Sequence, residues 1–321
     1  MITVVTPVYN EESNLPALHE RLDAVFRSGG LAYEWIIVDD CSTDSSFRVA
    51  TELAARNSAV RAYRFSRNFG SHAAIICGLE HSTGETAVVL ASDLQDPPEI
   101  IPLMLRQIDA GAGIVWAARE RRDNESLSTV LTSKLFYWVI RRVLKVERIP
   151  PLGADFFAVT RPVIDSLRRI QEPNVNVFMA LCWLGYTQKV VPYAKQARLS
   201  GTSSWSLFRR IKLAIDSFVA STYTPIRFMS ATGILTSVLG LIYAAAIVYN
   251  NIFHGGAVQG WPSLMVVTLL TSGIVMSMLG VLGEYIWRSL EASRSRPLYI
   301  VEHAVGSSAR DTPDATRDTV T

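Results

Sequence analysis

Cysteine is scarce in this sequence. Only Cys41, Cys77 and Cys182 occur among the 321 residues, and no two of them form a Cys-x-x-Cys pair. An odd number of widely separated cysteines does not build a disulfide framework, and a structural zinc site would need closely paired ligands. We therefore expect reduced thiols, as in a cytosolic protein.

The sequence also has little net charge and shows no signal-peptide pattern at its start. The formal net charge is only +2, and no run of lysine and arginine forms a patch of the kind that binds nucleic acid, so we expect no nucleic acid partner. The chain runs from Met1 into Pro7 without a basic segment and a long apolar stretch, so we expect no signal peptide. The first domain should therefore remain in the cytosol.

Hydrophobic residues are abundant, at 49% of the chain. Two almost uncharged runs, Phe228–Asn250 and Leu264–Trp287, each contain about 23 residues, enough to cross a hydrocarbon core of about 30 Å. Residues 251–263 between them carry no lysine or arginine, whereas Arg227 precedes the first run and Arg288 follows the second. The positive-inside rule then predicts a multi-pass protein of the cell inner (cytoplasmic) membrane with both termini in the cytosol.

The segments that flank these runs have different compositions. Residues 206–227 place apolar side chains at helical spacing beside basic ones, which predicts an amphipathic helix lying in the membrane interface. A buried amphipathic helix is the alternative. Residues 288–321 should form a cytosolic segment, and we expect it to be disordered after about residue 304 because it is polar and lacks periodicity.

The first 120 residues alternate short β-branched runs with amphipathic stretches, the pattern of βα units. The expected strands are Ile2–Thr6, Glu34–Val38, Val60–Phe65, Thr86–Leu90 and Gly113–Ala117, and helices should begin near Ser13, Asp44, Ser71 and Pro98. The pattern predicts an α/β sheet with several parallel strands, whose ligands bind beyond the carboxyl ends of those strands.

Residues 121–200 are less regular. They include a helical stretch, Leu127–Leu144, and two strand-like stretches, Asp155–Thr160 and Gln188–Val191. We interpret this part as the half of the domain that faces an acceptor. The two parts together predict one cytosolic domain over residues 1–205.

Polar clusters follow four of the expected strands, in residues 7–11 (PVYNE), 38–44 (VDDCSTD), 66–70 (SRNFG) and 92–99 (SDLQDPPE). The carboxyl ends of parallel strands meet at one sheet edge, where converging carboxylates repel one another unless a cation lies between them. Hard oxygen ligands favour Mg²⁺ or Mn²⁺, which usually also binds substrate phosphates. Each cluster alone fits an ordinary turn or cap, but four in successive loops predict a site.

These clusters resemble those of the inverting family 2 glycosyltransferases, in the polyprenyl-phosphate branch that includes dolichol-phosphate mannose synthases and bactoprenol glucosyltransferases. The resemblance extends from Pro7 to about Val301, and residues 283–286 (GEYI) and 296–299 (RPLY) are similar to the two-helix bactoprenol type. It implies a GT-A (Rossmann-like) α/β catalytic domain followed by two transmembrane helices.

The resemblance also implies which residues hold the donor. The nucleotide sugar would be bound by Pro7, Tyr9, Glu11, Asp39 and Asp40, with Arg67 and Gly70 closing on it and Arg198 balancing the charge of the leaving group. Ser204 and Trp205 stand where the segment around Arg198 usually carries lysine and tyrosine.

Metal and acceptor residues are implied in the same way. Mg²⁺ or Mn²⁺ would be bound by Asp93 and Gln95 with support from Asp96, whereas Ala91 stands where members commonly carry another aspartate, so weaker metal binding is expected. The acceptor phosphate would be bound by Arg119, Arg122 and Ser133. Asp155 would be the catalytic base or would orient the acceptor, and a capping role at a strand start is its alternative.

The implied reaction transfers a hexose, with inversion, from a nucleotide diphosphate sugar to polyprenyl phosphate at the cytosolic membrane face, for modification of a cell-envelope glycan or lipid. UDP-glucose and undecaprenyl phosphate are the substrates that the resemblance favours. The lipid bilayer is a further partner, a flippase and a downstream transferase would take the product, and glycines in the two apolar runs would permit a homo-oligomer.

Two other interpretations stay open. A processive polysaccharide synthase would need a Gln-x-x-Arg-Trp segment and more apolar helices, and the sequence has neither. A catalytically weakened homologue acting as a membrane scaffold is suggested by Ala91 and Ser204, and it would bind nucleotide without turnover.

Overall fold

The computed structural model describes residues 1–119, 155–170, 175–194, 224–254, 260–294 and 296–306. The chain divides into two compact units. The first unit contains the described residues up to 194 and again from 297, and the second contains the long helices between them. The predicted helices at Leu127–Leu144 and over most of 206–227 lie outside the described residues.

The first unit is built on one mixed sheet of eight strands in the order β7-β5-β6-β4-β1-β2-β3-β8. The strands are β1 (Ile2–Val8), β2 (Tyr33–Asp39), β3 (Val60–Phe65), β4 (Thr86–Val89), β5 (Ile114–Arg119), β6 (Phe156–Thr160), β7 (Gln188–Tyr193) and β8 (Val301–Val305). Strands β1 to β4 are mutually parallel, β6 is antiparallel to both of its neighbours, and β8 is antiparallel to β3.

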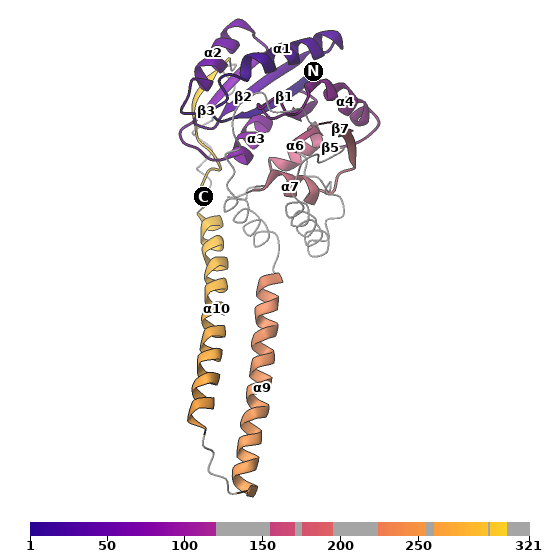
Figure 1. Cartoon of the computed structure of the whole chain (residues 1–321). Coiled ribbons are helices and arrows are strands. Elements are labelled where there is room, and N and C mark those ends of the chain that lie inside the picture. The colour runs from indigo at the N-terminus through magenta and orange to yellow at the C-terminus, as the bar shows by residue number, and fades with distance from the viewer. Residues whose placement is uncertain (120–154, 171–174, 195–223, 255–259, 295, 307–321) are drawn as a thin grey trace, which may run out of the picture. The chain divides into compact units, whose positions relative to one another are not determined.

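Helices cover both faces of this sheet (Figure 1). One face packs against α1 (Leu15–Ser28), α2 (Ser46–Arg56) and α4 (Ile101–Asp109), which follows the short helix η1 (Pro98–Ile100), and the other packs against α3 (Ser71–Glu80), α6 (Arg161–Leu167) and α7 (Val177–Trp183). Side chains alternate along each strand, so Val4 joins the first core and Val5 the second. The seven strands predicted from the sequence are confirmed.

Close packing fixes α3 against β1. A Cβ atom added at Gly78 would lie only 2.2 Å from Cγ1 of Val5. The helix α3 begins at Ser71, directly after Gly70. The contact between Gly78 and Val5 therefore helps to fix the position of the β3–α3 loop relative to β1. The packing thus positions one of the four polar clusters relative to another.

Two features of the sheet differ from the sequence expectations. Strand β6 enters antiparallel between β4 and β5, which gives the mixed sheet. Strand β8 lies in residues 288–321, where we expected no strand, and it pairs with β3 from Ala62 to Phe65. A five-residue edge strand has too little hydrophobic alternation to be recognised from its own sequence.

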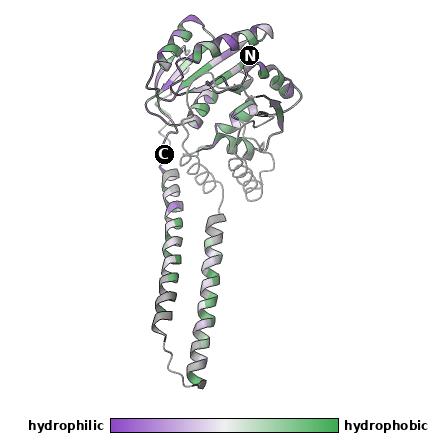
Figure 2. Cartoon of the chain, viewed as in Figure 1, coloured by the Kyte–Doolittle hydropathy of each residue, from purple (hydrophilic) through white to green (hydrophobic). Residues whose placement is uncertain are grey.

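The second unit contains two long helices, α9 (Thr224–His254) and α10 (Trp261–Ser293). Among the described residues, α10 contains one stretch, Leu270–Trp287, that is long and apolar enough to cross a membrane, whereas the apolar stretch of α9, Met229–Tyr243, is shorter. Figure 2 shows the apolar character of both helices. By length and composition, the structure supports one of the two predicted membrane spans.

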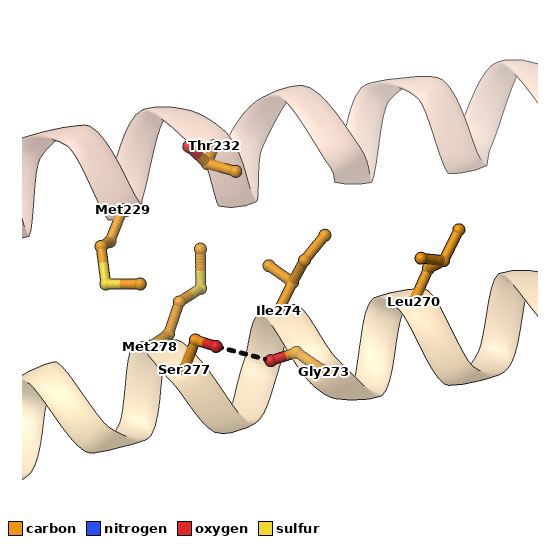
Figure 3. Close-up of a pocket in the computed structure, with 7 residues that line it drawn as sticks. All are labelled: Met229, Thr232, Leu270, Gly273, Ile274, Ser277 and Met278. Atoms are coloured by element: carbon orange, nitrogen blue, oxygen red, sulfur yellow. Dashed lines mark hydrogen bonds between the residues drawn. The ribbon is translucent and has the colours of Figure 1, made fainter.

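An open, mostly apolar pocket of about 430 Å³ lies between the helices α9 and α10. Its lining is formed by Met229, Thr232, Leu270, Gly273, Ile274, Ser277 and Met278 (Figure 3). The Ser277 hydroxyl donates to the Gly273 carbonyl oxygen at 2.9 Å, so this polar group is paired within α10. The helices also contact each other at Gly233 of α9, where an added Cβ would lie 2.9 Å from Cε of Met278 in α10.

Candidate functional site

Four loops at the carboxyl ends of β1, β2, β3 and β4 each contain a residue in the left-handed region of backbone conformation. These residues are Asn10 (φ 58°), Cys41 (φ 59°), Gly70 (φ 95°) and Leu94 (φ 59°). Left-handed backbone is unfavourable for residues other than glycine, and such strain gathers at binding and catalytic sites. Three of these four residues are not glycine, and their occurrence in loops at one edge of the sheet marks this edge as the candidate site.

The loops after β1 and β2 are held together by hydrogen bonds. The Asn10 amide donates to Oγ of Ser42 at 2.9 Å, and the Thr43 amide donates to Oδ1 of Asn10 at 2.8 Å. The Glu11 amide donates to Oγ of Ser46 at 2.8 Å. These bonds fix the two loops relative to each other before any ligand arrives.

Of the residues predicted to bind the donor, Pro7, Tyr9 and Glu11 all lie at the end of β1. The Pro7 carbonyl oxygen accepts from the Ser92 hydroxyl at 3.4 Å, which ties this strand to the loop after β4. Tyr9 is 47% exposed and is thus available to stack on a flat ring. A carboxylate oxygen of Glu11 accepts from the Asn14 amide group at 2.5 Å, so this side chain helps to shape the loop.

Asp39, the last residue of β2, is fully buried. Its Oδ2 accepts from the Ser42 amide at 3.2 Å, whereas its Oδ1 has no hydrogen-bond partner among the described residues. Burial raises the pKa of this carboxyl, against the opposing effects of the Ser42 hydrogen bonds and the Arg64 charge. A buried oxygen without a donor is costly, by about 1–3 kcal/mol, and a ligand N–H group could satisfy it.

The neighbouring Asp40 instead holds the β3–α3 loop. Its Oδ1 accepts from the Phe69 amide at 2.7 Å and its Oδ2 from the Gly70 amide at 2.9 Å. Burial raises the pKa of Asp40, and these two amides partly offset the increase. Both carboxylate oxygens are thus engaged in shaping the loop that carries Arg67.

Arg67 is exposed and lies over the ring of Phe69, with 3.9 Å between its guanidinium carbon and the ring centroid. The contact is a cation–π interaction within one loop. The structure therefore places a cation in the β3–α3 loop, close to Gly70 and to the carboxylate of Asp40.

The loop after β4 carries the predicted metal ligands. Oδ1 of Asp93 accepts from the Gln95 amide at 3.1 Å, and both residues are partly exposed. Asp96 is only 2% exposed, and one of its oxygens accepts a hydrogen bond from the Tyr193 hydroxyl. Asp96 thus connects the loop to β7 and lies deeper than Asp93.

Asp93 and Gln95 supply hard oxygen donors, which suit Mg²⁺ or Mn²⁺ when substrate phosphates complete the coordination shell. The described residues contain no group of three or more histidine, cysteine, aspartate or glutamate side chains arranged to hold a metal ion. The residues therefore fit a divalent cation shared with a ligand better than a site made by protein groups alone.

Asp155 lies directly before β6 and is exposed. His72, in the first turn of α3, lies close enough for their charges to interact, and its ring packs edge-on against Phe178 with 5.2 Å between the centroids. Burial lowers the pKa of His72, and Asp155 acts in the opposite direction. Sequence reasoning missed His72 because a single histidine in a helix carries no pattern.

The acceptor residues are less fully described. Arg119 ends β5, opposite Tyr193 of β7 in the register. Arg122 and Ser133, predicted to bind the acceptor phosphate, and Arg198, predicted to balance the leaving group, lie outside the described residues.

The comparisons with known proteins agree on one family. Residues 3–168 match the model described as glycosyl transferase family 2. The chain is 36% identical to an uncharacterised glycosyltransferase, YkcC, of Bacillus subtilis (strain 168), over 95% of this chain and 94% of that protein. It is 30% identical to the prophage bactoprenol glucosyl transferase homolog of Escherichia coli (strain K12), over 94% of this chain and 98% of that protein.

Solved structures show a more distant similarity. A crystal structure of glucosyl-3-phosphoglycerate synthase from Mycobacterium tuberculosis, in complex with Mn²⁺, UDP and phosphoglyceric acid, is 19% identical with a TM-score of 0.46, and the match covers 63% of this chain and 72% of that one. The family match over residues 3–168 and the nearly full-length relatives are sufficient: the chain belongs to glycosyl transferase family 2 and has its GT-A-like α/β fold with a mixed sheet.

Proposed function

We propose that this glycosyltransferase moves a hexose, with inversion, from a nucleotide diphosphate sugar to polyprenyl phosphate at the cytosolic face of the cell inner membrane. The observation that carries the proposal is the buried Oδ1 of Asp39, without a partner among the described residues, at the sheet edge that carries the strained residues Asn10, Cys41 and Leu94. Relatives named bactoprenol glucosyl transferase support the lipid acceptor.

The nucleoside end of the donor fits Asp39. An ionised carboxylate only accepts hydrogen bonds, so it selects a base that presents an N–H group. Uracil presents one imide N–H, and Tyr9 at the end of β1 offers an exposed ring for stacking. UDP-glucose is therefore the donor that we propose first.

The diphosphate end of the donor fits the loop after β4. When bound, a divalent cation would neutralise charge on the departing nucleoside diphosphate. Asp93 and Gln95 would hold that cation together with the diphosphate oxygens, and Arg67 and Arg198 would add positive charge. Asp96, which accepts a hydrogen bond from the Tyr193 hydroxyl, would hold the loop after β4 against β7.

The acceptor oxygen needs little activation. A phosphate monoester has its second pKa near about 6, so polyprenyl phosphate is largely dianionic at neutral pH. Asp155 would then orient the acceptor more than it abstracts a proton, with His72 beside it. Arg119, Arg122 and Ser133 would bind the acceptor phosphate.

The course of the chain supports two membrane crossings. The described residues up to 194 and those from Pro297 both belong to the sheet unit, and β8 pairs with β3 there. The chain between these two parts must cross the bilayer an even number of times if it is to return to the same side. If α10 crosses the bilayer, α9 must therefore cross as well. The apolar stretch of α9 would then span with help from its less apolar flanks.

A fusion experiment tests this topology. Alkaline phosphatase, which is active only outside the cytosol, should be active when fused after Gly260 and inactive when fused after Gly306. A fluorescent protein that folds only in the cytosol should give the reverse result at the two positions. Activity of the phosphatase at Gly306 would contradict the cytosolic C-terminus and the even number of crossings.

The role of Asp39 gives a second prediction. Asp39→Asn replaces one acceptor oxygen by an amide that donates, so UDP should bind roughly ten-fold more weakly or worse, as expected for a lost charge-assisted bond. Calorimetric titration of the full-length protein in detergent measures this change. Asp44→Asn, a partly exposed residue in the same loop, is a matched comparison and should bind UDP far more tightly than Asp39→Asn does.

The acceptor class is tested by competition between lipids and soluble phosphates. With labelled UDP-glucose and Mg²⁺ or Mn²⁺, undecaprenyl phosphate should accept the sugar, whereas undecaprenol and 3-phosphoglycerate should not. Transfer to the soluble phosphate but not to the lipid would overturn the proposed acceptor. Nucleotide binding without transfer to any acceptor would favour the membrane scaffold.

Further partners follow from the product. A polyprenyl-phosphate sugar made on the cytosolic face needs a separate protein to carry it across the bilayer and another transferase to use it, because two spans per chain form no convincing sugar pathway. Gly233 lies against the side chain of Met278, whereas Gly240, Gly273, Gly280 and Gly283 have open space around them, which would leave these glycines available for packing in a homo-oligomer.

A further inference from the structure

The segment Pro297–Gly306, here called the strap, connects the end of the helical excursion to the edge of the sheet. Its strand β8 runs antiparallel to β3, with Tyr63 opposite Ala304 and Arg64 opposite His303. The Ser66 amide donates to the Ile300 carbonyl oxygen at 3.0 Å. The strap therefore lies beside the end of β3, where the loop with Arg67 begins.

Side chains anchor the strap at the same end of β3. The Tyr299 ring stacks on Phe65 with 5.1 Å between centroids and 18° between planes, and its hydroxyl donates to a carboxylate oxygen of Glu80 in α3. Burial raises the pKa of Tyr299, so the hydroxyl keeps its proton. The strap thus contacts both elements, β3 and α3, that carry the β3–α3 loop.

Glu302 links the strap to the nucleotide site through Arg64. Nε of Arg64 lies 3.9 Å from Oε2 of Glu302 and 3.9 Å from Oδ2 of Asp39. The guanidinium also donates to the Ser42 carbonyl oxygen at 3.3 Å and lies over the Phe47 ring at 5.4 Å. One cation is therefore shared between a strap carboxylate and the buried carboxylate of the site.

From this arrangement we propose that Glu302 is a positioning residue for donor binding, which holds Arg64 away from Asp39. The proposal rests on the proposed nucleotide-sugar site. With Glu302 ionised, Arg64 is attracted in two directions and stays at 3.9 Å from Asp39. Without that charge, the guanidinium moves onto Asp39 and competes with the ligand N–H for its oxygens.

Glu302 lies shortly after the end of α10, whereas Asp39 lies near the start of the chain. The strap is the first described segment after the end of α10 that joins the sheet. The pairing of the strap with β3 places Glu302 beside Arg64. The donor site would therefore be complete only when the strap is paired with β3. The site would then include residues from both ends of the sequence.

The test is a comparison of UDP affinity and transfer kinetics in the full-length protein in detergent. Glu302→Gln should raise Kd for UDP and KM for the donor by about three-fold, the size expected for a partly exposed ion pair, while kcat and the melting temperature stay near wild type. Glu302→Asp should recover part of the affinity. Glu52→Gln, which removes an exposed partner of Arg48 on α2, is the matched control and should change neither value.

A double variant shows whether Glu302 acts through Arg64. In an Arg64→Gln background, adding Glu302→Gln should have no further effect on Kd, because the shared cation is already absent. Equal UDP affinity in wild type and Glu302→Gln, or additive effects in the double variant, would overturn the proposal and leave the proposed function intact. Failure of the wild-type protein to bind any nucleotide would overturn both.

Discussion

Replacing Asp93 with asparagine is expected to reduce sugar transfer by about a thousand-fold, which corresponds to roughly 4 kcal/mol of lost transition-state stabilisation. The sequence offers Ala91 where a second carboxylate would be expected, so Asp93 supplies most of the negative charge that holds the cation. Asparagine keeps an oxygen that can accept from the Gln95 amide, which bonds to Asp93 at 3.1 Å. The loop should therefore keep its shape while the metal is lost.

Initial rates of transfer at increasing Mg²⁺ or Mn²⁺ measure this effect. Asp93→Asn should need far more metal than wild type and should still bind UDP in its absence. Asp109→Asn, an exposed aspartate at the end of α4, is the control and should leave the rate unchanged. A rate in Asp93→Asn within a few-fold of wild type would exclude Asp93 as the principal metal ligand.

The second large effect is on the stability of the sheet unit. It concerns Glu34, near the start of β2 and away from the loops of the candidate site. Glu34→Ala should destabilise the sheet unit by about 3–5 kcal/mol, because it removes the carboxylate that balances the charge of the buried Arg61. Glu34 and Arg61 form an ion pair at 2.7 Å, with side chains 11% and 9% exposed. The Glu34 carboxylate also accepts from the Thr3 hydroxyl at 2.5 Å and from the Thr83 amide at 2.6 Å.

Thermal unfolding of the full-length protein measures this change, and the melting temperature should fall by roughly 10 °C. Glu52→Ala removes one partner of an exposed pair within α2 and should lower it by only about 1–2 °C. Equal effects of the two substitutions would show that the buried pair contributes no more than a surface pair.

The same residue gives a pH dependence. Burial alone would raise the pKa of Glu34, but the hydrogen bonds from Thr3 and Thr83 and the charge of Arg61 outweigh it, so its pKa is lowered. A lowered carboxyl pKa contributes stability that is present above the ordinary glutamate pKa and is lost as the pH falls through the folded-state value. Glu34→Gln should therefore lose less stability than wild type on acidification through that range.

Seven of the eight strands of the described sheet, and the edge where the polar loops meet, could be predicted from the sequence. Each predicted strand is a local hydrophobic pattern, and loops after parallel strands must meet at one edge, so Asp39 and Asp93 could be assigned to it before the structure was known. The direction of β6 was not predictable, because this strand is buried on both faces and its continuous apolar run is the pattern that a parallel strand would also show.

Contacts between distant segments also escaped prediction. The role of Asp40 at the nucleoside stays a prediction, but nothing in the sequence indicated that both of its oxygens accept from amides at Phe69 and Gly70, 29 and 30 residues further along the chain. Likewise, the pairing of β8 with β3 joins residues near 63 and 304. Such partners depend on tertiary geometry, which no local spacing encodes.

The most direct test of the central claim is detection of the glycolipid itself. Purified wild-type protein would be incubated with undecaprenyl phosphate, Mg²⁺ or Mn²⁺ and each of several nucleotide sugars, and the lipid products would be identified by mass spectrometry. The proposal predicts that one donor, UDP-glucose first, gives an undecaprenyl phosphate that is heavier by a single hexose, and that Asp93→Asn does not. Absence of any such lipid with every donor, from a protein that still binds UDP, would contradict the proposed reaction.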